Sequence, residues 1–316
     1  MNEKLFKLKI QALLHDPYWK IYNIERHEST MIEFIKDFVK KNIGLDLIDN
    51  DNFDNSVKIA DMLSSSLDRF PLSFYSKKNP SKIFHEILKV LYNDKNDKLY
   101  NVFSQTWEEN TIKAGEVNNE IYLDIFNKIS EYLKNKEDKD IKEKYKKIYK
   151  YFWTWLEIKI IKDYGFVLPQ DSRIPMFDIL DHIYSTAALI NLTYEGGYIV
   201  LVDIPGIQKF ISKGRKLRDL FAGSWLISIV MYKFLEKIAD EYGPDTIVTP
   251  TLRLNPFWVN HVSKDIEEIW NDYENLQILP KDWFRYAIIP GSSLIILPKD
   301  EILSSKEKVR EYLINK

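Results

Sequence analysis

The spacing of apolar residues changes once along this chain of 316 residues, directly after Glu195, where two glycines follow. Between residue 3 and about residue 190, apolar side chains recur every three to four positions, which predicts helices. After the glycines, the run 198–204 (YIVLVDI) is rich in β-branched residues and short enough to be a buried strand. The change predicts two domains, a mostly helical one over 1–193 and a mixed one over 194–316.

The second region alternates between predicted strands and helices. Pro205 and Gly206 end the first strand, and a helix begins near Ile207. The remaining predicted elements are a helix over 224–242 and strands over 246–249, 285–289 and 293–297. This order suits an α/β or α+β sandwich, and together with the helical first region it gives α+β as the predicted fold class.

Three polar segments of the helical region are predicted to lie at the surface. The charged segment 131–150 indicates a solvated helix or a helical hairpin. The segments 46–55 and 93–97 are rich in Asn and Asp, whose side chains compete with helical hydrogen bonds, so both are predicted loops.

Composition narrows the functions open to the chain. Its 45 Lys and Arg against 47 Asp and Glu give a net charge of −2, which argues against a uniformly basic nucleic-acid clamp and leaves only local contacts. It has no cysteine, which excludes disulfides and thiolate metal sites, so any metal must be held by histidine and carboxylate. With 45% hydrophobic residues it has ample material for a core.

The chain has no segment that resembles a targeting or membrane-spanning sequence. Its start, MNEKLFKLKI, alternates charged and apolar residues and lacks the apolar stretch of a signal peptide. The longest apolar runs, such as 225–232, are far shorter than the roughly 20 residues that span a bilayer. We therefore expect a cytoplasmic protein without a membrane partner.

His15 and Asp16, in LLHDPYW, pair an imidazole with a carboxylate, and such pairs bind divalent metals in hydrolases. Pro17 bars continuation of the first helix and pushes the residue before it out of the helical region. We expect Asp16 at the end of this helix and His15 one position inside it, with both side chains converging beyond that end. The alternative is a helix-terminal histidine beside a capping or solvated aspartate.

Two further predicted helices carry residues of the same kind. Asp61 and Asp68 are seven residues apart and share one helical face, whereas Asp178 and His182 are four apart and share another. Three helices would then offer two histidines and two aspartates, a mixed nitrogen and oxygen set that suits Mn, Fe, Ni, Co or Zn rather than Ca. The alternative is chance proximity, with Asp68 simply paired to Arg69.

Several longer blocks resemble the large subunit of type III CRISPR effector complexes, of the Cmr type. In chain order they are LLHDPYWK, His27-Glu28, ADMLSSSLDR, LPQDSRIPMFDILDHIYSTAAL, VDIPGIQKFISKGRKLRDLFAGSWLIS, TPTLRLNPFW and LPKDWFRYAIIP, and together they cover nearly the whole chain. The resemblance implies a circularly permuted HD phosphohydrolase domain, whose metal ligands follow the order His-Asp, Asp, His. It also implies a following ferredoxin-like palm domain, related to nucleotide cyclases and polymerases.

For the first domain, the resemblance implies metal-dependent cleavage of single-stranded DNA, with the metal ligands His15, Asp16, Asp61 and His182. A bound metal would make hydroxide available near neutral pH and neutralise phosphodiester charge. Lys20 would stabilise phosphate charge, and the alternative for it is a solvated side chain. His27 would hold a second metal or protonate the leaving group, and the alternative for it is a helix cap.

For the palm domain, the resemblance implies that the loop after the first strand approaches the phosphates of ATP, bound with Mg. The residues predicted to bind this nucleotide are Asp203, Gly206, Gln208, Arg218 and Ser224. A local basic cluster would contact triphosphate, guide RNA or target RNA, and comprises Lys209, Lys213, Arg215, Lys216 and Arg218. The alternatives are an ordinary exposed helix face for the cluster and a turn-holding role for Asp203.

The sequence lacks the Gly-Gly-Asp-Asp turn on which the family's cyclase chemistry depends. We therefore expect no cyclic oligoadenylate synthesis from this chain alone, and interpret it as a fragment, a split subunit or a shortened relative. Expected partners are other subunits of a type III complex, guide and target RNA, and single-stranded DNA. The alternative functions are a scaffold with a silent HD fold that docks a partner subunit and RNA, and a housekeeping phosphohydrolase acting on a small nucleotide.

Overall fold

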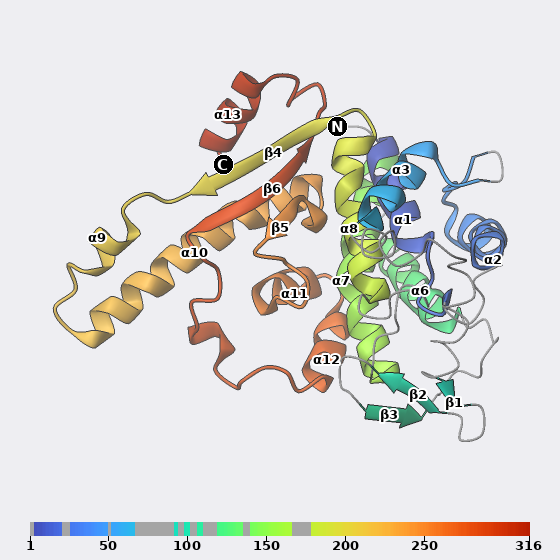
Figure 1. Ribbon diagram of the computed structural model, residues 1–316, viewed down its shortest axis with the longest axis horizontal. Helices are drawn as coiled ribbons and strands as arrows, with labels where there is room; N and C mark the ends of the chain where they lie inside the picture. The colour runs from blue at the N-terminus through green and yellow to red at the C-terminus, as the bar shows by residue number, and fades with distance from the viewer. Residues whose placement is uncertain are drawn as a thin grey trace, which may run out of the picture. The chain divides into compact units, whose positions relative to one another are not determined.

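A computed structural model describes residues 3–20, 26–49, 52–66, 92–93, 98–101, 106–109, 119–134, 140–165 and 178–316. Helices make up most of this part of the chain, and its strands form two three-stranded antiparallel sheets (Figure 1). The predicted α+β class is therefore confirmed.

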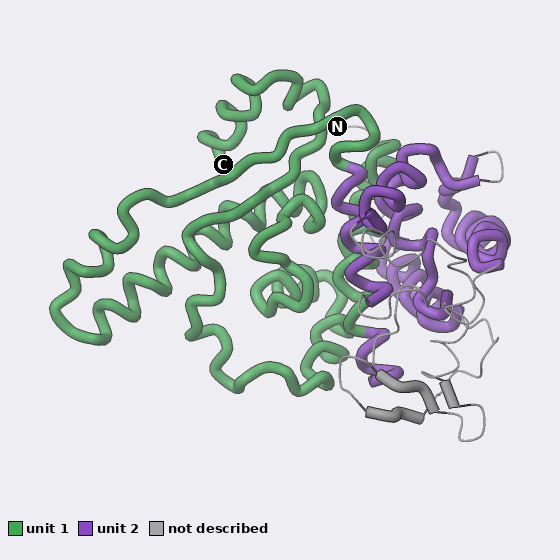
Figure 2. The backbone as a smooth tube through the Cα atoms, viewed as in Figure 1, with its two compact units in different colours: residues 1–6, 135–158, 191–316 green, residues 7–134, 159–190 purple. Residues whose placement is uncertain are grey.

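The chain divides into two compact units (Figure 2). Unit 1 comprises 1–6, 135–158 and 191–316, and unit 2 comprises 7–134 and 159–190. Each unit therefore draws on segments that are far apart in the sequence. The predicted domains are continuous segments that meet between residues 193 and 194, whereas each compact unit combines several segments. The predicted division therefore stays a prediction.

Unit 2 is built mainly from helices whose apolar faces form its core. In α6 (Glu120–Lys134) the buried apolar residues recur at helical spacing, and they are Ile121, Tyr122, Ile125, Phe126, Ile129 and Leu133. Burying each side chain of this size contributes about 1.5–3 kcal/mol. The other helices that belong wholly or mostly to this unit are α1 (Glu3–Leu14), α2 (His27–Phe34), the π-helix η2 (Ile35–Ile43), α3 (Asn55–Ser64) and α8 (Ile179–Thr193).

The first half of the chain also contains a small sheet that its helical spacing does not predict. Strands β1 (Tyr92–Asn93), β2 (Lys98–Asn101) and β3 (Thr106–Glu109) pair antiparallel in the order β1-β2-β3. These strands are two to four residues long, too short for an alternating pattern to stand out. The predicted loop at 93–97 begins inside β1, and its other residues lie outside the described part of the chain.

The charged segment 131–150 is only partly at the surface. Helix α6 ends inside it at Lys134, and α7 (Ile141–Tyr164) begins inside it. In α7, Ile148 and Tyr149 are fully buried although lysines surround them in the sequence. Leu133 and Tyr145 of the same segment are buried as well, because the side chains of a helix point in all directions and a charged run can still contribute to a core.

Unit 1 contains the second sheet, formed by β4 (Gly197–Asp203), β5 (Ile247–Thr249) and β6 (Ser292–Pro298). The order is β4-β6-β5, and β6 pairs antiparallel with both neighbours, with Leu201 opposite Leu294. The chain leaves β4 through α9 (Ile207–Ile211) and α10 (Leu217–Tyr242) before it reaches β5. The predicted strands at 198–204, 246–249 and 293–297 thus match β4, β5 and β6 to within a residue or two.

The predicted strand over 285–289 is wrong. Its first residue ends the 3₁₀ helix η4 (Trp283–Arg285), and the following residues form no strand. The amide of Ile289 donates to the hydroxyl of Ser228 at 2.8 Å, so it is satisfied by a side chain of α10 instead of a strand partner. The apolar residues of this segment produced the strand prediction, but periodicity does not reveal what pairs with the backbone.

Helix α10 provides much of the core of unit 1. Its buried residues include Met231, Leu235, Ile238, Ala239 and Tyr242, which repeat at helical spacing. The helix begins seven residues earlier than the predicted start at Ser224, and the predicted end at Tyr242 is confirmed. Unit 1 also contains η3 (Pro244–Thr246), α11 (Pro256–Ser263), α12 (Glu267–Asn275) and α13 (Lys306–Ile314).

Within the described ranges, no helix combines the length and apolar character needed to cross a bilayer.

Candidate metal centre

The first two predicted ligands follow directly after α1. The helix ends at Leu14, one residue earlier than expected, but the amide of His15 still donates to the Gln11 carbonyl at 2.8 Å. Asp16 comes next, and Pro17 prevents the helix from continuing past it. His15 and Asp16 therefore both lie in the turn that leaves the helix end.

The other two predicted ligands lie on helices, as expected. Asp61 is in α3, whose start is capped by Asp54 through a 2.8 Å hydrogen bond from the Ser56 amide. His182 is in the first turn of α8, and Asp178 caps this turn by accepting from the Asp181 amide. Capping is thus the observed role of Asp178, which the sequence paired with His182. Asp68, Arg69 and Asp171 lie outside the described residues.

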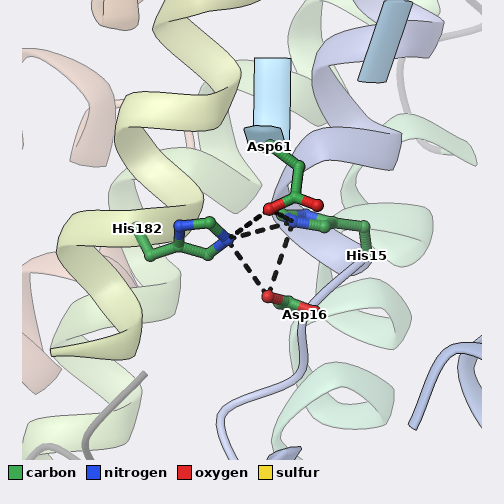
Figure 3. A group of neighbouring side chains, drawn as sticks. All are labelled: His15, Asp16, Asp61 and His182. Atoms are coloured by element: carbon green, nitrogen blue, oxygen red, sulfur yellow. Dashed lines mark hydrogen bonds and ion pairs between the residues drawn. The ribbon is translucent and has the colours of Figure 1, made fainter. Parts of the chain in front are cut away.

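The structure brings His15, Asp16, Asp61 and His182 to one point (Figure 3). One ligand atom from each residue lies within 4.8 Å of those of the other three. The Nε2 atom of His182 lies 3.1 Å from Asp16 Oδ2, 3.2 Å from Asp61 Oδ1 and 3.3 Å from His15 Nε2. The Nε2 atom of His15 lies 3.6 Å from Asp16 Oδ2 and 3.9 Å from Asp61 Oδ1.

The cluster is largely shielded from solvent. The exposed fractions of the His15, Asp16 and His182 side chains are 8%, 5% and 1%, whereas that of Asp61 is 32%. The site is therefore open to solvent mainly at Asp61. Low exposure strengthens the interaction of these groups with any bound charge.

The close packing of acids and imidazoles shifts their protonation. Burial alone would raise the pKa of Asp16, but His15 and Lys20, with hydrogen bonds from His182 and His27, hold that pKa well below its usual value. Burial would likewise raise the pKa of Asp61, but hydrogen bonds from His15 and His182 lower it. For His182, burial would lower the pKa, and hydrogen bonds to Asp16 and Asp61 raise it instead. Both carboxylates are therefore ionised at neutral pH.

Both histidines present the same ring nitrogen to the cluster. The Nδ1 atom of His15 lies 2.8 Å from the Ala12 carbonyl, to which it can only donate, so Nε2 is the nitrogen that is available to a metal. The Nδ1 atom of His182 lies 3.1 Å from Ser64 Oγ. Partners of this kind fix the ring orientation of metal-bound histidines.

The donor set fits a divalent transition metal. Bonds of about 2.0–2.2 Å to His and Asp ligands place neighbouring donor atoms roughly 3.0–3.5 Å apart. The observed separations of 3.1–3.9 Å therefore need only a small contraction. Two imidazoles and two carboxylates suit Zn, Mn, Fe, Co or Ni more than Ca, which prefers six to eight oxygens.

Lys20 and His27 both contact Asp16. The Lys20 ammonium donates to Asp16 Oδ2, and His27 Nε2, from the first residue of α2, lies 3.1 Å from Asp16 Oδ1. Neither residue belongs to the four-residue cluster itself. A solvated side chain is therefore the wrong interpretation of Lys20, which is held against the carboxylate.

Two serines next to the cluster were given no role by the sequence. Ser64 contacts the His182 ring, and Ser65 donates to Asp61 Oδ1 at 3.2 Å. Ser65 follows Asp61 by four residues, so helical spacing alone would have placed it beside that carboxylate. Ser64 is 118 residues from His182, and no local pattern connects them.

The predicted nucleotide-binding residues lie at the end of β4 and along α9 and α10. Asp203, Gly206, Gln208 and Arg218 are exposed, and Ser224 is half-buried. Gly206 has a φ of 76° and directly precedes α9, and Arg218 pairs with Asp219 at 3.6 Å. No hydrogen bond or ion pair connects these five described residues to one another, so the structure does not assemble them into a closed site.

The comparisons with known proteins all find proteins of the CRISPR Cmr system. Residues 199–316 match the family described as CRISPR-associated protein Cmr2, N-terminal. The CRISPR system CMR subunit Cmr2 of Saccharolobus solfataricus is 29% identical over 94% of this chain, and that of Pyrococcus furiosus is 28% identical over 99%. The chain is similar to the N-terminal part of Cmr2, a subunit of the CRISPR Cmr system. It spans 30% and 37% of the length of these two Cmr2 proteins.

Two solved structures contain a chain with a similar fold. Two cryo-EM structures of the type III-B Cmr-beta complex, one in the apo state and one bound to cognate target RNA, contain a chain that matches this one with a TM-score of 0.64. The matches are 27% identical and cover 98% of this chain, and 32% and 31% of those chains. The likeness to these chains of the Cmr-beta complex thus includes the helical half that the family match at 199–316 does not reach.

Proposed function

We propose that unit 2 is an HD-type, metal-dependent phosphohydrolase that cleaves single-stranded DNA, within a Cmr2 subunit of a type III-B Cmr complex. The observation that carries this proposal is the convergence of His15, Asp16, Asp61 and His182 on one point. These residues come from one turn and two helices, and they follow the permuted His-Asp, Asp, His order along the chain. The similarity to Cmr2 proteins and to a chain of the type III-B Cmr-beta complex supports the complex as the setting.

The metal would supply Lewis-acid activation of water and neutralise charge on the phosphodiester. The residues of the chain then divide the remaining tasks. His15 and His182 offer neutral nitrogen ligands, and the two ionised carboxylates balance the charge of the ion. Lys20, beside Asp16, attracts a phosphate oxygen, and His27 is placed to deliver a proton to the leaving group.

The test measures metal binding and cleavage together. Purified protein is analysed for bound metal and assayed on single-stranded DNA with Mn, Ni or Co. We expect stoichiometric metal and cleavage in the wild type, and loss of both in His15→Ala and Asp16→Ala. His261→Ala is the matched control, because this histidine lies in unit 1, where it contacts Asp240. A folded wild type without metal or cleavage would instead favour the scaffold that docks a partner subunit and RNA.

We also propose that 194–316 forms a palm-like domain that binds ATP with Mg. The β4-β6-β5 order, with helices between β4 and β5, is the strand order expected of the first three strands of a ferredoxin-like sheet. Asp203 ends β4, Gly206 and Gln208 follow it, and Arg218 and Ser224 lie on α10. Weaker binding of ATP by Asp203→Ala and Arg218→Ala, measured by calorimetry, would support this site. Equal binding by wild type and variants would refute it.

The proposed partners are other Cmr subunits and guide and target RNA. One of the matching Cmr-beta complexes is bound to cognate target RNA. The five residues of the basic cluster, which lie between positions 209 and 218, are all exposed. They are therefore available to contact a phosphate backbone. We expect no cyclic oligoadenylate synthesis by this chain, because it lacks a Gly-Gly-Asp-Asp sequence.

A further inference from the structure

We propose that Ser64 is a positioning residue for His182, acting through a hydrogen-bond relay that includes Ser185. The relay would hold the His182 ring in the tautomer that presents Nε2 to the metal. This inference rests on the proposed metal site and adds to it a residue that touches neither the metal nor the substrate.

The direction of the relay follows from the acceptors around Ser185. Its hydroxyl lies 2.6 Å from the Asp181 carbonyl and 3.0 Å from the His182 carbonyl, and its single proton goes to one of them. The Ser185 oxygen is then an acceptor for the Ser64 hydroxyl, which lies 2.6 Å away.

Ser64 has one other acceptor that would not reverse the relay. The His182 carbonyl lies 3.2 Å from the Ser64 hydroxyl, and it also accepts from Thr186 at 2.8 Å. Donation to Ser185 or to this carbonyl points the Ser64 proton away from the imidazole ring. Its oxygen then accepts from Nδ1–H of His182 at 3.1 Å, so that Nε2, which faces Asp16 and Asp61, offers a lone pair to a metal once the metal replaces the proton shared with these carboxylates.

The two histidines differ in what orients them. His15 donates to the backbone carbonyl of Ala12, which no substitution removes. His182 depends on the side chain of Ser64, which is half-buried at the end of α3. Ser64 also connects α3, which carries Asp61, to α8, which carries His182. Losing such a partner of a metal ligand typically lowers metal affinity by about 10- to 100-fold.

The chain offers a matched control in the same run of serines. Ser66 donates to the Leu63 carbonyl at 2.7 Å and is exposed, so Ser66→Ala removes a hydroxyl two residues away without touching the cluster. Ser64→Thr and Ser64→Val form a second matched pair, because the two side chains have nearly the same volume and only threonine keeps the hydroxyl.

The experiment titrates Co²⁺ into the full chain and follows its absorption. Ser64→Val should weaken Co²⁺ binding by about 10- to 100-fold, whereas Ser64→Thr and Ser66→Ala should stay close to the wild type. Nitrogen chemical shifts of His182 in the Zn²⁺-loaded protein should report a protonated Nδ1 in the wild type and in Ser64→Thr, with this signature altered in Ser64→Val. Should Ser64→Val fail to fold, Ser64→Ala removes the same hydroxyl without adding volume and should also weaken Co²⁺ binding.

The outcomes separate this inference from the proposed function. If the wild type binds no Co²⁺, or if His15→Ala binds it as well as the wild type does, the proposed metal site is refuted. A wild type that binds Co²⁺ at this site while Ser64→Val binds equally well, or Ser64→Thr binds as weakly as Ser64→Val, overturns the relay alone.

Discussion

At the scale of single residues, the Asp16 carboxylate is shared by several cationic or titratable groups. Lys20 and His182 contact its Oδ2 atom, and His27 contacts Oδ1. A metal at the cluster would have to compete with the Lys20 ammonium for the same oxygen. Lys20 therefore opposes metal binding through its charge, while it favours the approach of a phosphate.

Lys20→Ala should separate these two effects. We expect Co²⁺ affinity to stay equal or to rise, because a positive charge beside the cluster is removed. Cleavage of single-stranded DNA at saturating metal should fall by about tenfold or more, since a cation that stabilises phosphate charge is lost. Lys41→Ala is the control, as Lys41 forms an exposed pair with Asp37. Lower metal affinity in Lys20→Ala would contradict this assignment.

At the scale of elements, the glycine pair before β4 combines two different constraints. Gly196 has a φ of 81° with open space around its Cα, so a side chain there is strained only by the backbone. A Cβ atom on Gly197 would lie 2.3 Å from the Asn191 carbonyl oxygen and 2.6 Å from that of Leu297. The glycine pair at which the spacing of apolar residues changes is thus the point where β4 packs closely on α8 and β6.

Gly197→Ala should therefore destabilise unit 1 more than Gly196→Ala does. Overpacking against backbone atoms costs about 1–3 kcal/mol, and left-handed backbone with a Cβ costs about 1 kcal/mol. Urea unfolding of both variants, followed by circular dichroism, measures the difference. Equal losses would mean that the backbone around Gly197 moves aside without cost.

Helix α10 is connected to two other helices of unit 1 through Asp240. Its carboxylate lies 2.9 Å from His261 Nε2 in α11 and 3.3 Å from the Lys150 ammonium in α7. Burial alone would raise the pKa of Asp240, but the hydrogen bond from His261 and the charge of Lys150 lower it. A carboxylate with a lowered folded-state pKa stabilises the protein above its unfolded pKa, and this stabilisation is lost as the pH falls through the folded-state pKa.

Asp240→Asn should be less stable than the wild type by about 1 kcal/mol near pH 5, a modest value because the side chain is 37% exposed and screened. The difference should shrink as the pH falls below about 4, the unfolded pKa of aspartate, toward the lower pKa of the folded state. Chemical unfolding across this range measures it, with the exposed Glu301→Gln as control. A difference that stays constant with pH would show that the Asp240 charge does not contribute.

At the scale of the whole molecule, the candidate metal centre lies entirely within unit 2, and the second sheet lies entirely within unit 1. A ligand that binds only the folded form of one unit stabilises that unit in proportion to the logarithm of its concentration over Kd. The two units should therefore respond separately to metal.

Hydrogen exchange with and without saturating Co²⁺ tests this separation. We expect slower exchange at the end of α1, in α3 and in the first turn of α8, and unchanged exchange in β4 and β6. His15→Ala should remove the protection, because it removes a ligand. Equal protection of β4 and β6 would mean that the two units open as one cooperative body.

Local features of the sequence determined several parts of this protein. The spacing of apolar residues predicted α10 and the three strands of the second sheet, and Pro17 fixed the end of α1 to within one residue. These predictions succeed because each depends on neighbours within a few positions along the chain. The convergence of His15 with His182 was instead an inference from residue types and resemblance, because 167 residues separate them.

Only the tertiary structure decided which groups surround the candidate ligands. It placed Lys20 and His27 against Asp16, and it placed Ser64 against the His182 ring. It also closed the space around Gly197 and satisfied the Ile289 amide with Ser228, so that the predicted strand there does not form. The physical reason is the same in each case: a hydrogen bond or a close contact depends on distance in space, and periodicity along a chain carries no information about that distance.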